Sequence, residues 1–446
     1  MTDTIFALAT AAGRAAIAVV RLSGPGTGAI LHALCGGALS PRTAVLRSLA
    51  GPDGDVLDRA LVLWFPGPAS YTGEDCGELH LHGGAAVVDG VMAALTILGA
   101  RLAEAGEFTR RAFENGKLDL DQAEAVADLV NAETTGQARQ AVAQLGGALG
   151  DRYKAWRRQV TTILAQLEAA VDFPDEALPA DIEERARAPL DALVRELDEA
   201  LADGARGRQV REGYRVAVIG APNAGKSSLF NAMLRRDAAI VTATPGTTRD
   251  VIEAPLRLGG YSVVLADMAG VRETGEPIEA EGVRRARLWA TAADLRIWVA
   301  DRAAADDAWE QVTDLVRPGD LCLLNKSDLA PTPAGTRAEA AARRLGLDTA
   351  TVSLTRGEAE AVWEALSRRV TRDLAGVDFP ATTRARHARH LAGARDHLVR
   401  AVGMLADPEL AAEDVRMAAR RLRMVTGEIG VEDVLGEVFA TFCIGK

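Results

Sequence analysis

One run of residues has the spacing of a phosphate-binding loop. Gly220 to Ser227 (GAPNAGKS) fits G-x-x-x-x-G-K-[ST], and it lies between an apolar strand, 216–219, and a helical pattern that begins at Ser227. Glycines let backbone N–H groups turn toward phosphate oxygens, Lys226 supplies a charge for the β- and γ-phosphates, and the Ser227 hydroxyl can bind Mg²⁺. The run predicts a nucleoside triphosphate site.

A second motif predicts which base is bound. Asn325-Lys326-Ser327-Asp328 directly follows the apolar strand 321–324. The Asp328 carboxylate can accept two hydrogen bonds from the N1–H and 2-amino groups of guanine, whereas adenine has no such pair of donors. We therefore expect GTP rather than ATP. The last guanine-contacting loop is expected after the strand 350–352, at Ser353, Leu354 and Thr355.

A third motif concerns hydrolysis. Asp267-Met268-Ala269-Gly270 follows the strand 261–266 and resembles D-x-x-G, so Asp267 is expected in the Mg²⁺ shell and the Gly270 N–H against the γ-phosphate. Small signalling GTPases place a water-orienting Gln at the next position, which is Val271 here. Because valine cannot orient water, either hydrolysis is very slow or another residue takes that role.

A monovalent cation offers one replacement. Asn223 and the segment 242–250 (TATPGTTRD) resemble GTPases that bind K⁺ beside the nucleotide, where the ion neutralises developing charge. In that interpretation the Asn223 side chain, the carbonyls of Thr242 and Thr244, and Thr247 surround K⁺, while Thr248 completes the Mg²⁺ shell. The alternative is a polar, flexible switch loop without an ion. The residues expected to contact GTP directly include Asn223, Ala224, Gly225, Lys226, Ser227 and Ser228.

Composition indicates a globular, intracellular protein. The chain has 446 residues, 48% of them hydrophobic and 25% charged, which is enough for two or three domains. Its start lacks a basic signal region, and no apolar stretch reaches membrane-spanning length. We expect a cytoplasmic protein without disulfides, because the four cysteines lie far apart, at Cys35, Cys76, Cys322 and Cys443.

The net charge of −11 does not favour nucleic acid, because binding a polyanion depends on clustered cations. The C-terminal part nevertheless contains several arginines, which could form a local basic face or simply lie on solvated helices. These are Arg384, Arg386, Arg389, Arg395, Arg400, Arg416, Arg420, Arg421 and Arg423. A partner protein could carry most of the RNA contact.

The composition and hydrophobic periodicity of the sequence change three times along the chain. Short apolar runs between Gly- and Pro-containing turns predict an α+β domain over 1–117, and Ala-, Leu- and Glu-rich periodicity predicts an all-α region over 118–210. Strands then alternate with helices over 211–377, which is typical of a Ras-like α/β P-loop G domain with a doubly wound, mostly parallel sheet. Helical texture returns over 378–446, so we expect one helical domain interrupted by an inserted G domain.

Longer runs carry a family resemblance. They are 70–75 (SYTGED), 78–84 (ELHLHGG), 106–120 (GEFTRRAFENGKLDL), 246–250 (GTTRD) and the terminal 443–446 (CIGK). Together they resemble the bacterial tRNA uridine-modification GTPases of the MnmE/TrmE family, and the match covers essentially the whole chain. The segment 11–16 (AAGRAA) departs from the family's usual Pro- and Gly-rich loop.

The resemblance implies a function beyond GTP binding. It implies a K⁺-stimulated GTPase that acts in C5 modification of the wobble uridine of certain tRNAs, with Glu279 orienting water through a second water. It also implies a homodimer of N-terminal domains and a heterotetramer with the FAD-dependent partner MnmG (GidA). A 5-formyl- or methylene-tetrahydrofolate would supply the carbon unit, held by Arg21, Glu78, Lys117 and Lys446.

Three points stay open. Cys443 is either a reactive thiol or a small packed side chain. His80, His82, His387 and His390 have no carboxylate or Cys partner at ligand spacing, so we expect structural histidines rather than a metal site. The rival functions are a regulatory or ribosome-assembly GTPase of the Era/Der type and a folate-dependent transferase with a regulatory G domain.

Overall fold

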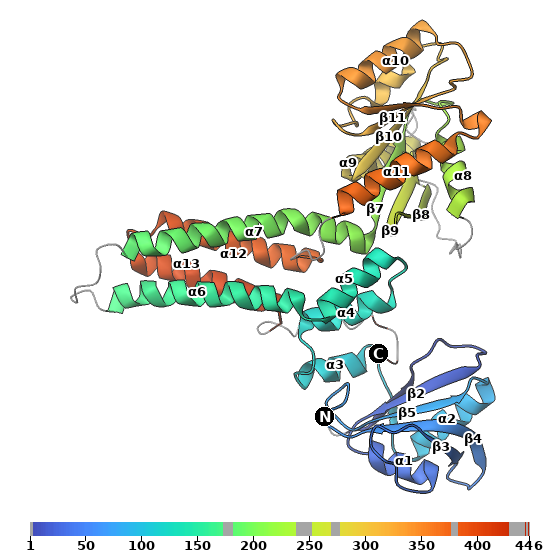
Figure 1. Cartoon of the computed structure of the whole chain (residues 1–446), viewed down its shortest axis with the longest axis vertical. Helices are drawn as coiled ribbons and strands as arrows, with labels where there is room; N and C mark the ends of the chain where they lie inside the picture. Colours follow the sequence, from blue (N-terminus) through green and yellow to red (C-terminus); the bar gives the residue numbers. More distant parts are fainter. Residues whose placement is uncertain are drawn as a thin grey trace. The chain divides into compact units, whose positions relative to one another are not determined.

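The computed structural model describes residues 3–172, 182–237, 252–268, 277–375, 382–427, 442 and 445 (Figure 1). Side chains are described for these residues except 172, 182–184, 237 and 277–283. The chain divides into two compact units. The first unit comprises Met1–Asn131, Ala141–Asp198 and Arg386–Lys446, and the second comprises Ala132–Gln140 and Glu199–Ala385.

The first unit contains a six-stranded sheet in the order β3-β4-β5-β2-β1-β6. Its strands are β1 Ile5–Leu8, β2 Ile17–Ser23, β3 Val45–Ala50, β4 Val56–Phe65, β5 Cys76–His82 and β6 Arg101–Leu102. Helices α1 (Thr27–Cys35) and α2 (Ala85–Ile97) both pack on one face, because Leu31 and Leu95 share one core with Leu22 and Leu79 of the sheet. This arrangement confirms the α+β expectation for the N-terminal part.

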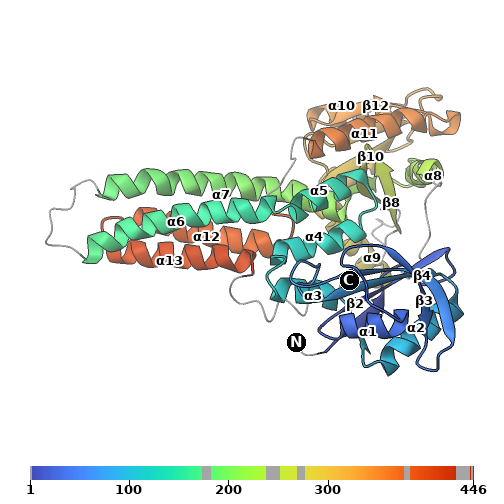
Figure 2. The same ribbon diagram turned by 60° about the horizontal axis from the view of Figure 1, so that its bottom comes forward.

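The rest of the first unit is helical. The helices that lie wholly or partly in this unit are α3 Glu107–Glu114, α4 Leu120–Val130, α5 Thr135–Leu145, α6 Ala148–Asp172, α7 Ile182–Glu212, α12 Ala385–Gly403 and α13 Pro408–Val425. Residues 135–140 of α5, 199–212 of α7 and Ala385 of α12 belong to the second unit. Helices α6, α12, α13 and the first part of α7 run side by side (Figures 1 and 2). Each buries a stripe at helical spacing, as Trp156, Val160, Ile163 and Leu167 do on α6, so packing stabilises the bundle.

Local signals set where two of these helices begin. Asp119 caps α4 by accepting a hydrogen bond from the Gln122 N–H, and the Gln122 side chain accepts one from the Asp119 N–H, which completes a capping box. Asp407 caps α13 in front of Pro408, whose missing N–H costs nothing at the first helical position. Both starts could be read from the sequence.

The second unit contains a six-stranded sheet in the order β12-β11-β10-β7-β9-β8, in which only β8 pairs antiparallel. The strands are β7 Tyr214–Ile219, β8 Ile252–Leu258, β9 Tyr261–Asp267, β10 Leu295–Asp301, β11 Leu321–Asn325 and β12 Asp348–Thr351. The helices are α8 Lys226–Asp237, α9 Pro277–Ala292, α10 Pro333–Arg344 and α11 Ala359–Leu374, with 3₁₀ turns η1 Ala308–Val312 and η2 Leu354–Arg356.

Helices cover both faces of this sheet. Val216 and Val218 of β7 share a core with α8 and α11, whereas Ala217 and Ile219 share one with α9 and α10. The doubly wound, mostly parallel fold is therefore confirmed, and the carboxyl ends of β7, β9, β11 and β12 meet at one edge, where such folds bind ligands. The expected domain boundaries after 117, 210 and 377 stay predictions.

Among the described residues, no helix is both long enough and apolar enough to cross a membrane.

Candidate nucleotide-binding site

The phosphate loop joins β7 to α8 through backbone conformations that only glycine adopts easily. Gly220 has φ +150° and Gly225 φ +110°, and Asn223 between them has φ +61°. A Cβ on Gly220 would lie 2.3 Å from the carbonyl oxygen of Val299 on β10, so no larger residue fits there. The loop therefore turns tightly into the start of α8, where N–H groups and the helix dipole favour an anion.

Lys226, the first residue of α8, is buried, and its ammonium group folds back over the loop. Nζ donates hydrogen bonds to the carbonyl oxygens of Gly220 at 2.9 Å and Ala221 at 3.0 Å. The ammonium charge is thus held against the phosphate loop, and only 7% of Lys226 is exposed. A bound triphosphate would meet this ammonium group as a positioned point charge.

Ser227 and Asp267 lie together at the ends of α8 and β9. The Ser227 hydroxyl donates to Asp267 Oδ2 at 2.8 Å, and Asp267 Oδ1 is buried without a hydrogen-bond partner in the described part of the chain. A buried carboxylate oxygen without a partner is costly, and hard oxygen ligands are what Mg²⁺ prefers. The pair therefore fits a magnesium ion beside the phosphates.

Asn325 connects the phosphate loop to the base-reading loops. Its Nδ2 donates to the Ala224 carbonyl at 2.8 Å, and its Oδ1 accepts from the Leu354 N–H at 3.2 Å. A Cβ on Gly225 would lie 2.2 Å from Asn325 Nδ2, so this glycine leaves room for the link. One buried amide side chain thus holds three segments of the site in register.

Asp328 and Ser353, the residues predicted to read the base, lie together. The Ser353 hydroxyl donates to Asp328 Oδ1 at 2.6 Å and lies 3.0 Å from the Thr355 hydroxyl. This hydrogen bond from Ser353 lowers the pKa of Asp328, so the carboxylate is ionised and can accept hydrogen bonds from guanine. The structure brings together the residues predicted for this purpose.

Asp301 is a member of the site that the sequence motifs did not indicate. Lys326 has φ +61°, and its Nζ donates to Asp301 Oδ2 at 2.6 Å. Asp301 ends β10 opposite Asn325 on β11, so the ion pair holds Lys326 beside the base-reading loop. The signal that could have revealed Asp301 in the sequence is its position as an aspartate at the end of a strand of the same parallel sheet.

Several predicted residues lie outside the described part of the chain. These are Thr242, Thr244, Thr247, Thr248 and Gly270, together with Cys443 and Lys446. Glu279 belongs to α9, for which the structure describes the backbone at this position but not the side chain. Asn223 and Ser228 are exposed, Asn223 in the phosphate loop and Ser228 on α8, and Ala224 is buried beneath the loop.

Two of the residues predicted to hold folate, Arg21 and Glu78, lie together on the face of the first sheet opposite α1 and α2. Arg21 on β2 donates to Glu78 on β5 at 2.9 Å, and its guanidinium lies 5.5 Å from the centre of the Tyr71 ring. Lys117 Nζ donates to the Pro68 carbonyl at 3.1 Å, in the loop that leads to Tyr71. A cation, a carboxylate and an aromatic ring therefore lie on one surface.

The described cysteines do not fit a reactive role. Cys35, Cys76 and Cys322 are free and buried, and burial raises the pKa of Cys322 to about 12. A thiol that stays protonated at neutral pH is a poor nucleophile.

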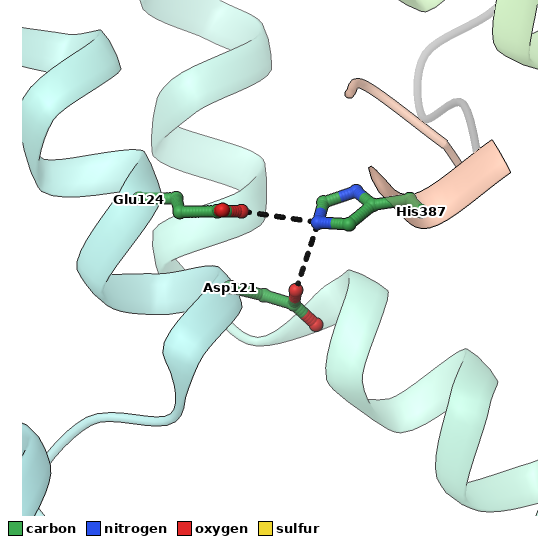
Figure 3. Close-up of side chains that lie close together, drawn as sticks. All are labelled: Asp121, Glu124 and His387. Atoms are coloured by element: carbon green, nitrogen blue, oxygen red, sulfur yellow. Dashed lines mark hydrogen bonds and ion pairs between the residues drawn. The ribbon is translucent and has the colours of Figure 1, made fainter. Parts of the chain in front are cut away.

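The premise that these histidines have no carboxylate partner is wrong for His80, His82 and His387, while the expectation of structural histidines stays a prediction. His80 Nε2 lies 3.3 Å from Glu78, and His82 Nδ1 lies 2.7 Å from Asp58. His387 Nε2 lies 3.0 Å from Glu124 and 3.3 Å from Asp121, two residues of α4 (Figure 3). The partner of His82 comes from β4 and those of His387 from α4, so spacing along the sequence did not reveal them. Burial and the Arg386 charge lower the pKa of His390 to about 4.

Fold and site together define a GTP-binding protein of the P-loop class, with a phosphate loop, the Ser227–Asp267 pair and the Asp328 carboxylate at one edge of a doubly wound sheet. Comparison with known proteins narrows the class. A family model described as the MnmE helical domain matches residues 120–443, and one described as the GTP-binding protein TrmE N-terminus matches residues 4–117. The chain belongs to the MnmE family of tRNA modification GTPases.

Several relatives match this chain over its full length. Relatives named tRNA modification GTPase MnmE from Phenylobacterium zucineum and Caulobacter vibrioides are 57% and 58% identical, each with 100% of both chains covered. One from Maricaulis maris is 50% identical, again with 100% of both chains covered. The solved G domain of the T. maritima FeoB iron transporter is 25% identical over 35% of this chain and 98% of its own, with a TM-score of 0.26. The fold assignment rests on strand order and not on that likeness.

Proposed function

We propose that this GTPase is stimulated by K⁺ and acts in C5 modification, of the carboxymethylaminomethyl or aminomethyl type, of the wobble uridine of certain tRNAs. The observation that carries the GTP part is the Asn325 side chain, which joins the phosphate loop to the guanine-reading loop. Membership of a tRNA modification family supports the RNA part. The free, buried thiols of the described cysteines support a cytoplasmic location.

The site residues divide the work of hydrolysis. Lys226 holds and neutralises the β- and γ-phosphates, and Ser227, Asp267 and Thr248 would hold Mg²⁺, which supplies charge stabilisation when bound. Val271 follows Gly270 where a water-orienting glutamine stands in small signalling GTPases, so we assign water positioning to Glu279, through a second water. The chain thus binds, orients and neutralises, and the attacking water is held in line with the γ-phosphate.

K⁺ would be held by Asn223, Thr242, Thr244 and Thr247. The left-handed backbone of Asn223 and its exposed side chain at the loop support an oxygen ligand there. We expect GTP turnover at constant ionic strength to be at least about tenfold faster in K⁺ than in Na⁺, because a bound cation offsets charge that develops on the phosphates. In Asn223→Ala the ratio of the two rates should approach one. Equal rates in the unmodified protein would remove the cation from the proposal.

We assign the carbon unit to 5-formyl- or methylene-tetrahydrofolate. Arg21, Glu78 and Lys117 support this, because folate carries anionic carboxylates and a pterin ring that pairs with a carboxylate. Lys446 would add a cation, and Cys443 would take part in the modification step as a thiol. These assignments follow the family resemblance.

The proposed partners are a second copy of the chain, the FAD-dependent MnmG and tRNA. Ile17, Leu46 and Leu61 are 60%, 49% and 44% exposed, and Leu46 pairs with Leu61 across the open face of the first sheet. An exposed apolar sheet face supports a homodimer through these strands. Basic patches for RNA are less evident, since Arg386, Arg395, Arg400 and Arg416 all lie beside carboxylates. Much of the RNA contact therefore falls to the partner.

Deleting the gene tests the proposal. We expect nucleoside mass spectrometry of tRNA from the deletion strain to show wobble uridine without the C5 group, and a plasmid copy of the gene should restore it. Unchanged modification would refute the proposal and favour a regulatory or ribosome-assembly GTPase. Loss of modification that a GTPase-inactive copy fully restores would favour a folate-dependent transferase with a regulatory G domain.

A further inference from the structure

A buried cluster of four charged or titratable side chains lies where α12 meets α4. Arg386 and His387, in the first turn of α12, face Asp121 and Glu124 on α4 (Figure 3 shows the last three). Arg386 NH2 lies 3.2 Å from Glu124 and 3.6 Å from Asp121, and His387 Nε2 lies 3.0 Å from Glu124. The side chains of Asp121, Glu124 and His387 are at most 2% exposed, and that of Arg386 is 14% exposed.

The cluster has the ligand types of a metal site, but an arginine already lies beside its carboxylates. Asp121, Glu124 and His387 each offer one atom within 4.8 Å of the others. Arg386 NH2, however, lies 2.9 Å from His387 Nε2 and within 3.6 Å of both carboxylates, so a divalent ion would lie against a guanidinium. Burial disfavours a charged imidazole, yet the carboxylates of Glu124 and Asp121 outweigh it and raise the pKa of His387. The two carboxylates thus favour the charged form of His387 and also lie beside the Arg386 guanidinium.

The same arginine also holds the end of α13. Arg386 NH1 donates to the carbonyl oxygens of Met424 at 3.1 Å and Val425 at 2.7 Å, in the last turn of that helix. Carbonyls there lack partners within the helix, and a cation also suits the negative end of the helix dipole. One guanidinium therefore ties three helices together: α12 through its own backbone, α4 through Glu124, and α13 through its last carbonyls.

Helix α4 also contacts described residues of the chain that follows α13. Phe442 shares a small core with Ala123 and Ala127 of α4. Gly427, with φ +79°, lies so close to α4 that a Cβ there would be 2.9 Å from Leu120 Cβ. The segment after α13 thus rests on α4 at both described points near its ends.

The last described residue, Gly445, is similarly confined. It has φ +102°, and a Cβ there would lie 2.4 Å from the Leu8 carbonyl oxygen at the end of β1. Only glycine fits this position. Phe442 and Gly445 are therefore confined by contacts with α4 and β1, and α4 is held by the charged cluster.

From these contacts we propose that Arg386 and His387 are positioning residues for the uridine modification. They hold α4 and the end of α13 in one frame. Helix α4 and strand β1 in turn contact Phe442 and Gly445, which in the sequence directly precede Cys443 and Lys446. Arg386 is also the first residue of the first unit after the chain returns from the nucleotide-binding unit, so a displacement of the chain there acts first on this pair. The inference rests on the proposed function and adds residues that touch neither nucleotide nor folate.

The test separates the two activities of the full-length protein. In Arg386→Met we expect GTP turnover within about twofold of the unmodified protein, and wobble-uridine modification about 100-fold slower, since a misplacement of about 1 Å can cost that much. Arg158→Met is the control, because Arg158 is exposed on α6, lies outside the arginines considered for a basic face, and should leave both activities unchanged. Should Arg386→Met not fold, Arg386→Gln with Glu124→Gln removes both charges together and carries the same expectation.

A double-mutant cycle tests whether Arg386 acts on the modification through the C-terminal segment that contains Phe442. Phe442→Ala should also slow modification, and combining it with Arg386→Met should add little, because both loosen the same segment. Additive effects, normal modification in Arg386→Met, or an equal loss of GTP turnover would overturn the inference. A stoichiometric divalent metal in the purified protein that Glu124→Gln removes would also overturn it. Failure of the unmodified protein to modify tRNA would instead count against the proposed function.

Discussion

Gly225→Ala is expected to weaken GTP binding by about 100-fold. Alanine at φ +110° is strained, and its Cβ would lie 2.2 Å from Asn325 Nδ2, so either the loop or the amide must move. Strain of about 1–3 kcal/mol corresponds to a loss of up to about 100-fold in affinity. Movement of Asn325 would also break its hydrogen bonds to Ala224 and Leu354. Titration with a fluorescent GTP analogue measures the change.

Gly357→Ala is the matched control for this variant. Gly357 also has a left-handed backbone, with φ +81°, but a Cβ there would meet nothing within 4 Å. It therefore carries the backbone strain, about 1–2 kcal/mol, without the collision. We expect a small loss of thermal stability and GTP affinity close to that of the unmodified protein. If both variants lose affinity equally, the strain and not the contact with Asn325 is responsible.

Lys226→Ala is expected to reduce GTP turnover by about 10²–10³-fold, which is the usual effect of removing one positioned charge or donor from a site of this kind. The ammonium group is held over the phosphate loop by two carbonyl groups, so no other described side chain of α8 can replace it from the same place. Because hydrolysis is proposed to drive the modification, tRNA from a strain with this variant should contain hypomodified wobble uridine. Phosphate release and nucleoside mass spectrometry are the two measurements.

Arg235→Ala provides the comparison for Lys226→Ala. Arg235 is an exposed cation in the last turn of the same helix, and its removal changes the net charge by the same amount. Turnover should be unaffected, because an exposed charge far along the helix is screened by solvent. Normal wobble-uridine levels in the Lys226→Ala strain would mean that nucleotide handling is not required for modification.

Much of the second unit was predictable from the sequence. The phosphate loop, the D-x-x-G aspartate and the N-K-x-D motif each follow an apolar strand, and parallel strands in an α/β fold end at the same edge. Their convergence is therefore dictated by local pattern and a general topological rule. The helical texture of the first unit was predictable for a similar reason, because apolar residues at helical spacing require a buried face.

Which side chains became partners was decided only by the tertiary structure. Asp301 and Lys326 meet because β10 and β11 are neighbours, and nothing in the spacing of either residue indicates an ion pair. His387 looked isolated because its carboxylates lie more than two hundred positions away on α4. Local sequence determines helices, strands, caps and turns through short-range sterics and periodicity. Packing over long distances in the chain determines which charges are buried together.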